Sequence, residues 1–147
     1  MIEETLRFEA GDKEGKKIDY IIYYPENMNN TPLPLLLFLH GIGERGGEIE
    51  SIKRHGIPKI ISGGKNFPFI CIAPQCPKDG YWIQNEYVLL LIGLINHIKK
   101  THNIDRVFGT GLSMGGFGIL EVAINEPGLF NAIIPICGGA NFSKLDR

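Results

Sequence analysis

Three short runs of continuously apolar residues constrain the fold of this chain more than any other feature. They cover Leu35–Leu39, Phe67–Ala73 and Asn131–Cys137, and a fourth, shorter strand is predicted over Arg106–Phe108. A strand that is apolar at every position is buried on both faces, which is typical of a parallel sheet with helices on each side. The runs therefore predict the centre of such a sheet.

Helical segments separate these predicted strands. Glu48–Ser62 is polar at its start and carries Pro58, which we expect to break or kink the helix. Asn85–Lys100 has apolar residues at three- and four-residue spacing, and its last turn holds two lysines that suit the helix dipole. Met114–Asn125 closes before Pro127. Strands that alternate with helices predict an α/β fold with right-handed crossovers.

The N-terminal part of the chain has a different pattern. Residues 4–10 and 17–24 show partial apolar and polar alternation, and Gly11 and Gly15 lie between them, so we expect an antiparallel hairpin of half-exposed strands. The whole sequence of 147 residues is about one domain in length. We therefore predict a single domain over residues 1–147, with about six strands in a mostly parallel sheet between two helical layers.

Charge and hydropathy exclude several classes of protein. Lys and Arg total 15 against 16 Asp and Glu, and no basic run suggests nucleic acid or an anionic membrane as a partner. The longest uncharged apolar stretch, Tyr87–Ile95, is about half of the ~20 residues needed to span a bilayer. Glu3, Glu4 and Arg7 interrupt any signal peptide, so we expect a cytoplasmic protein unless the N-terminus has been processed.

The cysteines give no sign of a metal site or a cofactor. Cys71, Cys76 and Cys137 are an odd set without a C-x-x-C pair and without a histidine at metal-ligand spacing. We expect reduced, mostly buried thiols, with a bridge between Cys71 and Cys76 as the alternative.

A first glycine loop, His40–Gly46, follows the third predicted strand. It contains G-x-G-x-x-G, so a dinucleotide-binding loop has to be considered. That motif normally follows the first strand of its fold, and the next strand should end in an acidic residue for the ribose. Here that strand ends in Ala73-Pro74-Gln75, and no second mononucleotide-binding half fits in the chain.

A second glycine loop, between a predicted strand and a predicted helix, carries G-x-S-x-G: Gly111-Leu112-Ser113-Met114-Gly115. This is the context of a nucleophile elbow, in which a tight turn leaves no room for side chains two residues either side of the serine. We therefore predict that Ser113 is a nucleophile, with the elbow glycines Gly111 and Gly115 and the loop glycines Gly41 and Gly43 around it. The Met114 and Ile42 amides would form the oxyanion hole. A glycine-rich helix start capped by Ser113 is the alternative.

These segments resemble the α/β-hydrolase family, and more narrowly the carboxylesterase and polyhydroxybutyrate-depolymerase-like esterases, a group that includes putative peptidases and phospholipases. The matching segments are Leu37–Gly41 with its glycine loop, Ala73–Pro77, Val107–Gly118 and Pro135–Gly139. The resemblance implies a three-layer sandwich and a serine hydrolase of short acyl or aryl esters that needs no cofactor. It also implies that Trp82 walls the substrate pocket, although a core or rim aromatic is an equal alternative.

The base of a catalytic triad is missing from the expected place. In this fold the order along the chain is serine, acid, histidine, and no histidine follows Ser113, so we expect a chain truncated after its sixth strand. His97 and His102 precede the strand that leads to Ser113 and belong to the opposite sheet edge. His55, nine residues into its predicted helix, would lie ~14 Å from the active edge. His40 ends a strand on the correct side and is the candidate base.

Two readings of function follow. The first is a serine esterase that acts on a small-molecule ester, and the second is a catalytically silent binding or assembly module that keeps the elbow. Glu44 is a candidate pocket residue, although a solvated loop charge is expected more often at such a place. The Asn131–Cys137 strand would be an exposed apolar edge that pairs with a second copy or another chain, although Pro135 removes one donor.

Overall fold

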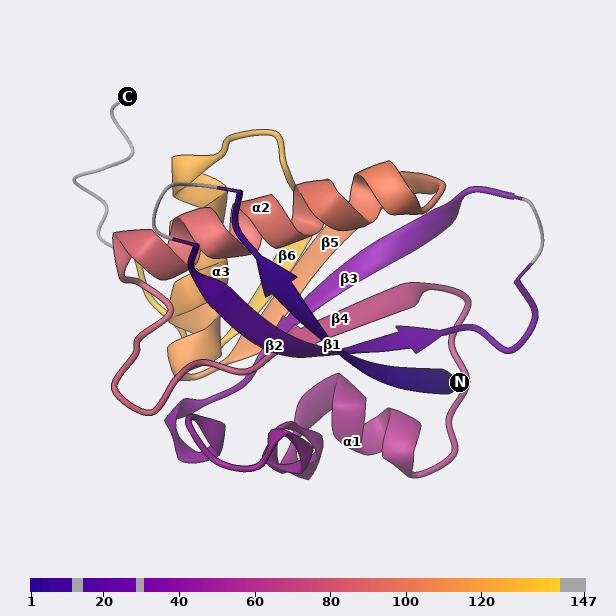
Figure 1. Cartoon of the computed structure of the whole chain (residues 1–147), viewed down its shortest axis with the longest axis horizontal. Helices are drawn as coiled ribbons and strands as arrows, with labels where there is room; N and C mark the ends of the chain where they lie inside the picture. Colours follow the sequence, from indigo (N-terminus) through magenta and orange to yellow (C-terminus); the bar gives the residue numbers. More distant parts are fainter. Residues whose placement is uncertain (12–14, 29–30, 141–147) are drawn as a thin grey trace.

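The computed structural model describes residues 1–11, 15–28 and 31–140, and these residues form a sheet of six strands between two layers of helices (Figure 1). The strands lie in the order β1-β2-β4-β3-β5-β6. β2 pairs antiparallel with β1 and β4, whereas β4, β3, β5 and β6 run parallel. The α/β fold with an antiparallel N-terminal hairpin is confirmed. Residues 12–14, between β1 and β2 in the sequence, lie outside the described residues. The strand bounds are β1 Ile2–Glu9, β2 Lys17–Tyr24, β3 Leu33–Leu39, β4 Ile70–Pro74, β5 Ile104–Leu112 and β6 Ala132–Ile136.

Helices cover both faces of the sheet. α2 and α3 lie on one face, and the short helices η1 and η2 together with α1 lie on the other (Figure 1). Leu91 and Leu94 of α2 are fully buried in the larger core, and Ile52 of η2 is fully buried in the smaller one. The predicted three layers are therefore confirmed. The helix bounds are η1 Ile42–Glu44, η2 Ile49–Arg54, α1 Gly56–Ser62, α2 Asn85–Thr101 and α3 Met114–Asn125.

The helical segment predicted over Glu48–Ser62 is broken as expected, but not at Pro58. The segment forms the 3-10 helix η2 and the α-helix α1, with extended backbone at His55 between them. The break comes at Gly56 (φ +62°), where a Cβ would lie 2.3 Å from the Phe38 ring, so tertiary packing sets its position. Pro58 falls in the first turn of α1, where the lost amide has no intrahelical acceptor in any case.

Several strand predictions also differ from the structure. β5 begins before Arg106 and continues through Gly109 to Leu112. Gly109 does not end the strand, because its lack of a side chain makes room for Phe130: a Cβ there would lie 3.0 Å from the Phe130 ring. β2 is mostly buried rather than half exposed, since it lies inside the sheet. β6 is apolar throughout but alternates between exposed and half-buried residues, because it is an edge strand that α3 covers on one face.

Candidate functional site

Ser113 lies at a sharp turn between β5 and α3. Its backbone has φ 53° and ψ −114°, a left-handed conformation that is rare outside glycine and stores strain. The turn is held in place because the Ser113 amide donates to the Ile136 carbonyl of β6 (2.8 Å). The side chain is exposed at the carboxyl edge of the sheet, where ligands bind in open α/β sheets.

Close backbone contacts explain two of the elbow glycines. A Cβ at Gly115 would lie 1.9 Å from the Leu39 carbonyl oxygen, and one at Gly111 would lie 2.3 Å from the Gly115 oxygen. The elbow is therefore packed directly against the backbone at the end of β3. Gly43 differs, because no atom lies within 4 Å of the place its Cβ would take. Space does not require a glycine there.

The turn after β3 lies beside the elbow, because Leu39 of β3 pairs with Gly111 of β5. A Cβ at Gly41 would lie 4.0 Å from the Ser113 Cβ. Ile42 is the first residue of η1 and Met114 is the first residue of α3. The N–H of a first helical residue has no intrahelical acceptor and is available to a ligand. Ile42, Ser113 and Met114 thus line one pocket, although their roles in an oxyanion hole remain a prediction.

An apolar pocket of about 230 Å³ opens beside Ser113. Four of its lining side chains are about half exposed, so the pocket is a surface depression with apolar walls. The Arg45 guanidinium stacks over the Tyr81 ring with 4.5 Å from Cζ to the ring centroid, and it donates to the Gly80 carbonyl (2.9 Å). Arg45 therefore fixes one wall. The lining residues are Ile42, Tyr81, Ile83, Ser113, Met114 and Phe117.

His40 is buried below this edge, and both of its ring nitrogens are bonded to the backbone. Nδ1 donates to the Gly41 carbonyl (2.7 Å), and Nε2 accepts from the Cys76 amide (3.0 Å). This pattern requires the neutral ring. Burial lowers the pKa of His40 below its ordinary value, against smaller opposing effects of the Gly41 hydrogen bond and of Glu44. No nitrogen of His40 is left to accept the proton of Ser113.

Trp82 belongs to the core rather than to the pocket lining. It is fully buried, and its indole N–H donates to the His40 carbonyl (3.1 Å). Its Cβ lies 2.4 Å from the place a Cβ at Gly118 would take, so α3 packs tightly on it. Trp82 thus holds the end of β3 through this hydrogen bond and packs between that end and α3.

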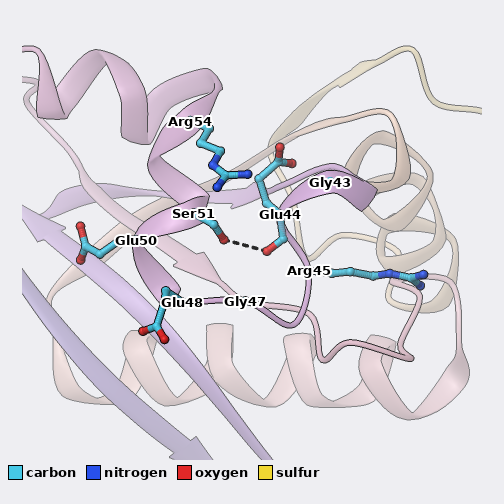
Figure 2. Close-up of a pocket in the computed structure, with 8 residues that line it drawn as sticks. All are labelled: Gly43, Glu44, Arg45, Gly47, Glu48, Glu50, Ser51 and Arg54. Carbon is cyan, nitrogen blue, oxygen red and sulfur yellow. Dashed lines mark hydrogen bonds between the residues drawn. The ribbon is translucent and has the colours of Figure 1, made fainter.

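Glu44 is buried, and the expectation of a solvated loop charge is wrong. It is 7% exposed and faces a second, charged pocket of about 350 Å³ between η1 and η2 (Figure 2). Its Oε1 lies 3.6 Å from Nε2 of His55. The expected ~14 Å between His55 and the active edge is therefore also wrong, because the broken helix returns this ring to the turn after β3.

The remaining titratable candidates lie elsewhere. His97 is near the carboxyl end of α2 and His102 follows it, so both precede β5, at the edge opposite Ser113. Glu121 is buried in α3, where its carboxylate accepts from the Asn125 amide (3.2 Å). Asp146 lies outside the described residues.

Within residues 1–11, 15–28 and 31–140, no group of three His, Cys, Asp or Glu side chains is placed to hold a metal ion. Over the same residues, no helix has the length and apolarity to cross a bilayer. The G-x-G-x-x-G loop leads into short 3-10 helices, not the α-helix that a dinucleotide fingerprint requires. All three cysteines are free, and Cys137 is exposed.

Sequence reasoning missed most of the apolar pocket. Tyr81, Ile83 and Phe117 surround Ser113 but follow no chemical motif. Phe117 could have been found, since it lies one helical turn after Ser113 and its amide donates to the Ser113 carbonyl (3.1 Å). Tyr81 and Ile83 come from the loop before α2, and no local pattern places that loop.

The architecture is that of the α/β-hydrolases, and solved esterases share it. A thermostable esterase is 31% identical, with a TM-score of 0.77, and the match covers 97% of this chain and 43% of that one. An acetyl xylan esterase from Aspergillus awamori (18% identity, TM-score 0.67) matches 90% of this chain and 50% of its own. A ferulic acid esterase (19% identity, TM-score 0.65) matches 92% of this chain and 58% of its own.

These matches have a clear limit in length. The chain spans only about half of each solved esterase, from 43% to 58%. The two below 25% identity bear on the fold alone. No protein-family model and no curated protein matches the sequence.

Proposed function

We propose that this chain carries the nucleophile and oxyanion hole of a serine hydrolase of carboxylic esters with short acyl or aryl groups. The observation that carries the proposal is the strained, exposed Ser113 beside two helix-initiating amides. The likeness to a thermostable esterase over 97% of the chain supports an ester as the substrate.

The proposed reaction is acyl transfer through Ser113. Its Oγ attacks the ester carbonyl carbon, and the carbonyl oxygen becomes an oxyanion held by the Met114 and Ile42 amides. The bond to the leaving oxygen then breaks, the serine proton ends on that oxygen so that an alcohol departs, and water hydrolyses the acyl-enzyme. Each such donor is worth ~3 kcal/mol of transition-state stabilisation. The apolar pocket beside Ser113 would hold an uncharged part of the ester. Because both nitrogens of His40 are bonded, we assign it to holding this turn.

Labelling and turnover test the proposal together. The chain is treated with a fluorophosphonate, and hydrolysis of short p-nitrophenyl esters is followed in parallel, with Ser113→Ala as the matched control. We expect labelling of wild type and none of the variant, with ester turnover above that of the variant. Turnover and labelling that survive Ser113→Ala would refute the role of Ser113.

A silent binding or assembly module is the second candidate. It is favoured by one observation: both ring nitrogens of His40 are bonded to the backbone, so this ring cannot accept the Ser113 proton. In this case the wild-type chain takes no label and turns over no ester, yet it still folds. The same experiment therefore separates the two candidates.

We also propose that β6 is a pairing edge for a second copy of the chain or for another chain. β6 is the last strand in the sheet order, and its Ile134 and Ile136 side chains are 67% and 46% exposed. Its Ile136 carbonyl accepts from the Ser113 amide, so the strand that would be paired also supports the elbow. Light scattering on the wild type and on Ile134→Lys tests self-association. A concentration-independent monomer in both would argue against it.

A further inference from the structure

A buried carboxylate and an exposed imidazole meet beside the turn that follows β3. Oε1 of Glu44, the last residue of η1, lies 3.6 Å from Nε2 of His55. His55 comes from the junction of η2 and α1, where the backbone is extended (φ −140°, ψ 166°). The Glu44 side chain is 8% exposed and that of His55 is 54% exposed. The pair therefore links the interior of the turn to solvent.

The Glu44 carboxylate borders the same small space as the Ser113 side chain. A Cβ at Gly41 would lie 3.2 Å from the Glu44 Oε2 and 4.0 Å from the Ser113 Cβ. The Glu44 backbone carbonyl accepts from Ser51 Oγ (2.9 Å; Figure 2) and from Gln75 Nε2 (3.0 Å). η1, which presents the proposed oxyanion donor of Ile42, is thus held at Glu44 by hydrogen bonds to its backbone carbonyl and by the contact of its side chain with His55.

A negative charge at this position affects the proposed reaction. When Ser113 attacks an ester, negative charge develops at the neighbouring amides, and a poorly solvated anion close by opposes it. A protonated His55 supplies a compensating charge. In Figure 2 the Arg54 guanidinium points toward the Glu44 carboxylate, whereas Glu48 and Glu50 point away from it. The charged and titratable groups around the pair are Glu48 before η2, Glu50 and Arg54 of η2, Arg45 after η1, and His40 after β3.

We propose that Glu44 and His55 are positioning residues for the Ser113 site, an inference that rests on the proposed function. The pair fixes η1, and when the imidazole is protonated it cancels the carboxylate charge beside the developing oxyanion. Loss of His55 alone removes one cation beside the Glu44 carboxylate and leaves its compensation to Arg54, so the negative charge is balanced less well. It therefore harms the reaction more than loss of both side chains.

The test is the rate constant for fluorophosphonate labelling of Ser113 between pH 5.5 and 8. It compares wild type with His55→Gln, Glu44→Gln and the double variant, with His97→Gln on α2 as the matched histidine control. We expect His55→Gln to slow labelling about fivefold at pH 5.5, the upper range for a partly exposed ion pair. The slowing should shrink as the pH rises, since only the protonated imidazole carries the compensating charge. The double variant should recover part of the rate, and His97→Gln should match wild type.

The outcomes separate this inference from the proposed function. A wild-type to His55→Gln ratio that is constant with pH, or a double variant as slow as His55→Gln, overturns the inference while Ser113 remains reactive. A wild-type chain that takes no label overturns the proposed function first, and the inference with it. Because the His55 side chain is exposed, His55→Gln should fold. The pH dependence of the wild-type to His55→Gln labelling ratio therefore tests the inference even if Glu44→Gln does not fold.

Discussion

The substitution Gly115→Ala tests the packing of the elbow most directly. An added Cβ would lie 1.9 Å from the Leu39 carbonyl oxygen and 2.8 Å from that of His40, whereas ordinary contacts begin near 3.4 Å. Both neighbours are main-chain atoms at the end of the central strand β3, so relief requires α3 to move away from the sheet. Overpacking in a well-packed interior costs ~1–3 kcal/mol, and a clash with backbone belongs at the upper end. We therefore expect unfolding free energy to fall by about 3 kcal/mol, and Tm by about 6–12 °C.

Gly43→Ala is the matched control for this change. It makes the same chemical substitution at the same sheet edge, but no atom lies within 4 Å of the added methyl group. We expect a change of no more than ~0.5 kcal/mol. Urea unfolding followed by circular dichroism gives both values, and equal m-values show that the comparison concerns stability. If Gly115→Ala proves as stable as Gly43→Ala, the proposed contact between the elbow and β3 is wrong.

Three further predictions concern the rest of the fold. Trp82→Phe keeps the aromatic ring but removes the buried N–H that bonds the His40 carbonyl, so urea unfolding should show a loss of ~1–2 kcal/mol, and no loss would contradict the buried bond. In the native chain only Cys137 should react promptly with a thiol reagent, and Cys137→Ser should abolish that fast phase. The Arg7 hydrogen bond lowers the pKa of the Asp19 carboxyl, so its stabilisation is present above the ordinary aspartate value of ~3.9 and is lost as the pH falls. Between pH 5 and pH 3, wild type should therefore lose more unfolding free energy than Arg7→Gln, and equal losses would exclude this contribution.

Local patterns in the sequence predicted the sheet and the elbow well. The apolar run Leu35–Leu39 falls within β3, and the periodic segment Asn85–Lys100 nearly coincides with α2. Both were predictable because a strand buried on two faces and a helix buried along one stripe leave distinct sequence patterns. The elbow was predicted for a steric reason, and the close contacts of Gly111 and Gly115 have the same origin.

Features that depend on distant contacts were not predictable in this way. The helix break at Gly56 is set by the ring of Phe38 across the core, and the burial of Glu44 depends on a chain reversal that brings back His55. The strand predicted over Arg106–Phe108 continues through Gly109 in β5, where the absence of a side chain makes room for Phe130. In each case the partner is far away in sequence, so no window of neighbouring residues contains the information.

The pairing of β3 with β5 also governs when the site can come into existence. Leu36 pairs with Phe108 and Leu39 with Gly111, across the whole stretch that holds η1, η2, α1, β4 and α2. Closing so long a loop into a parallel pair is slow, since most of its entropy is lost before contacts compensate. On a translating ribosome, the β1–β2 hairpin can form as soon as it leaves the exit tunnel. The serine and the amide of Ile42 meet only after β5 has emerged, so any reactivity would arise only once that strand has left the ribosome.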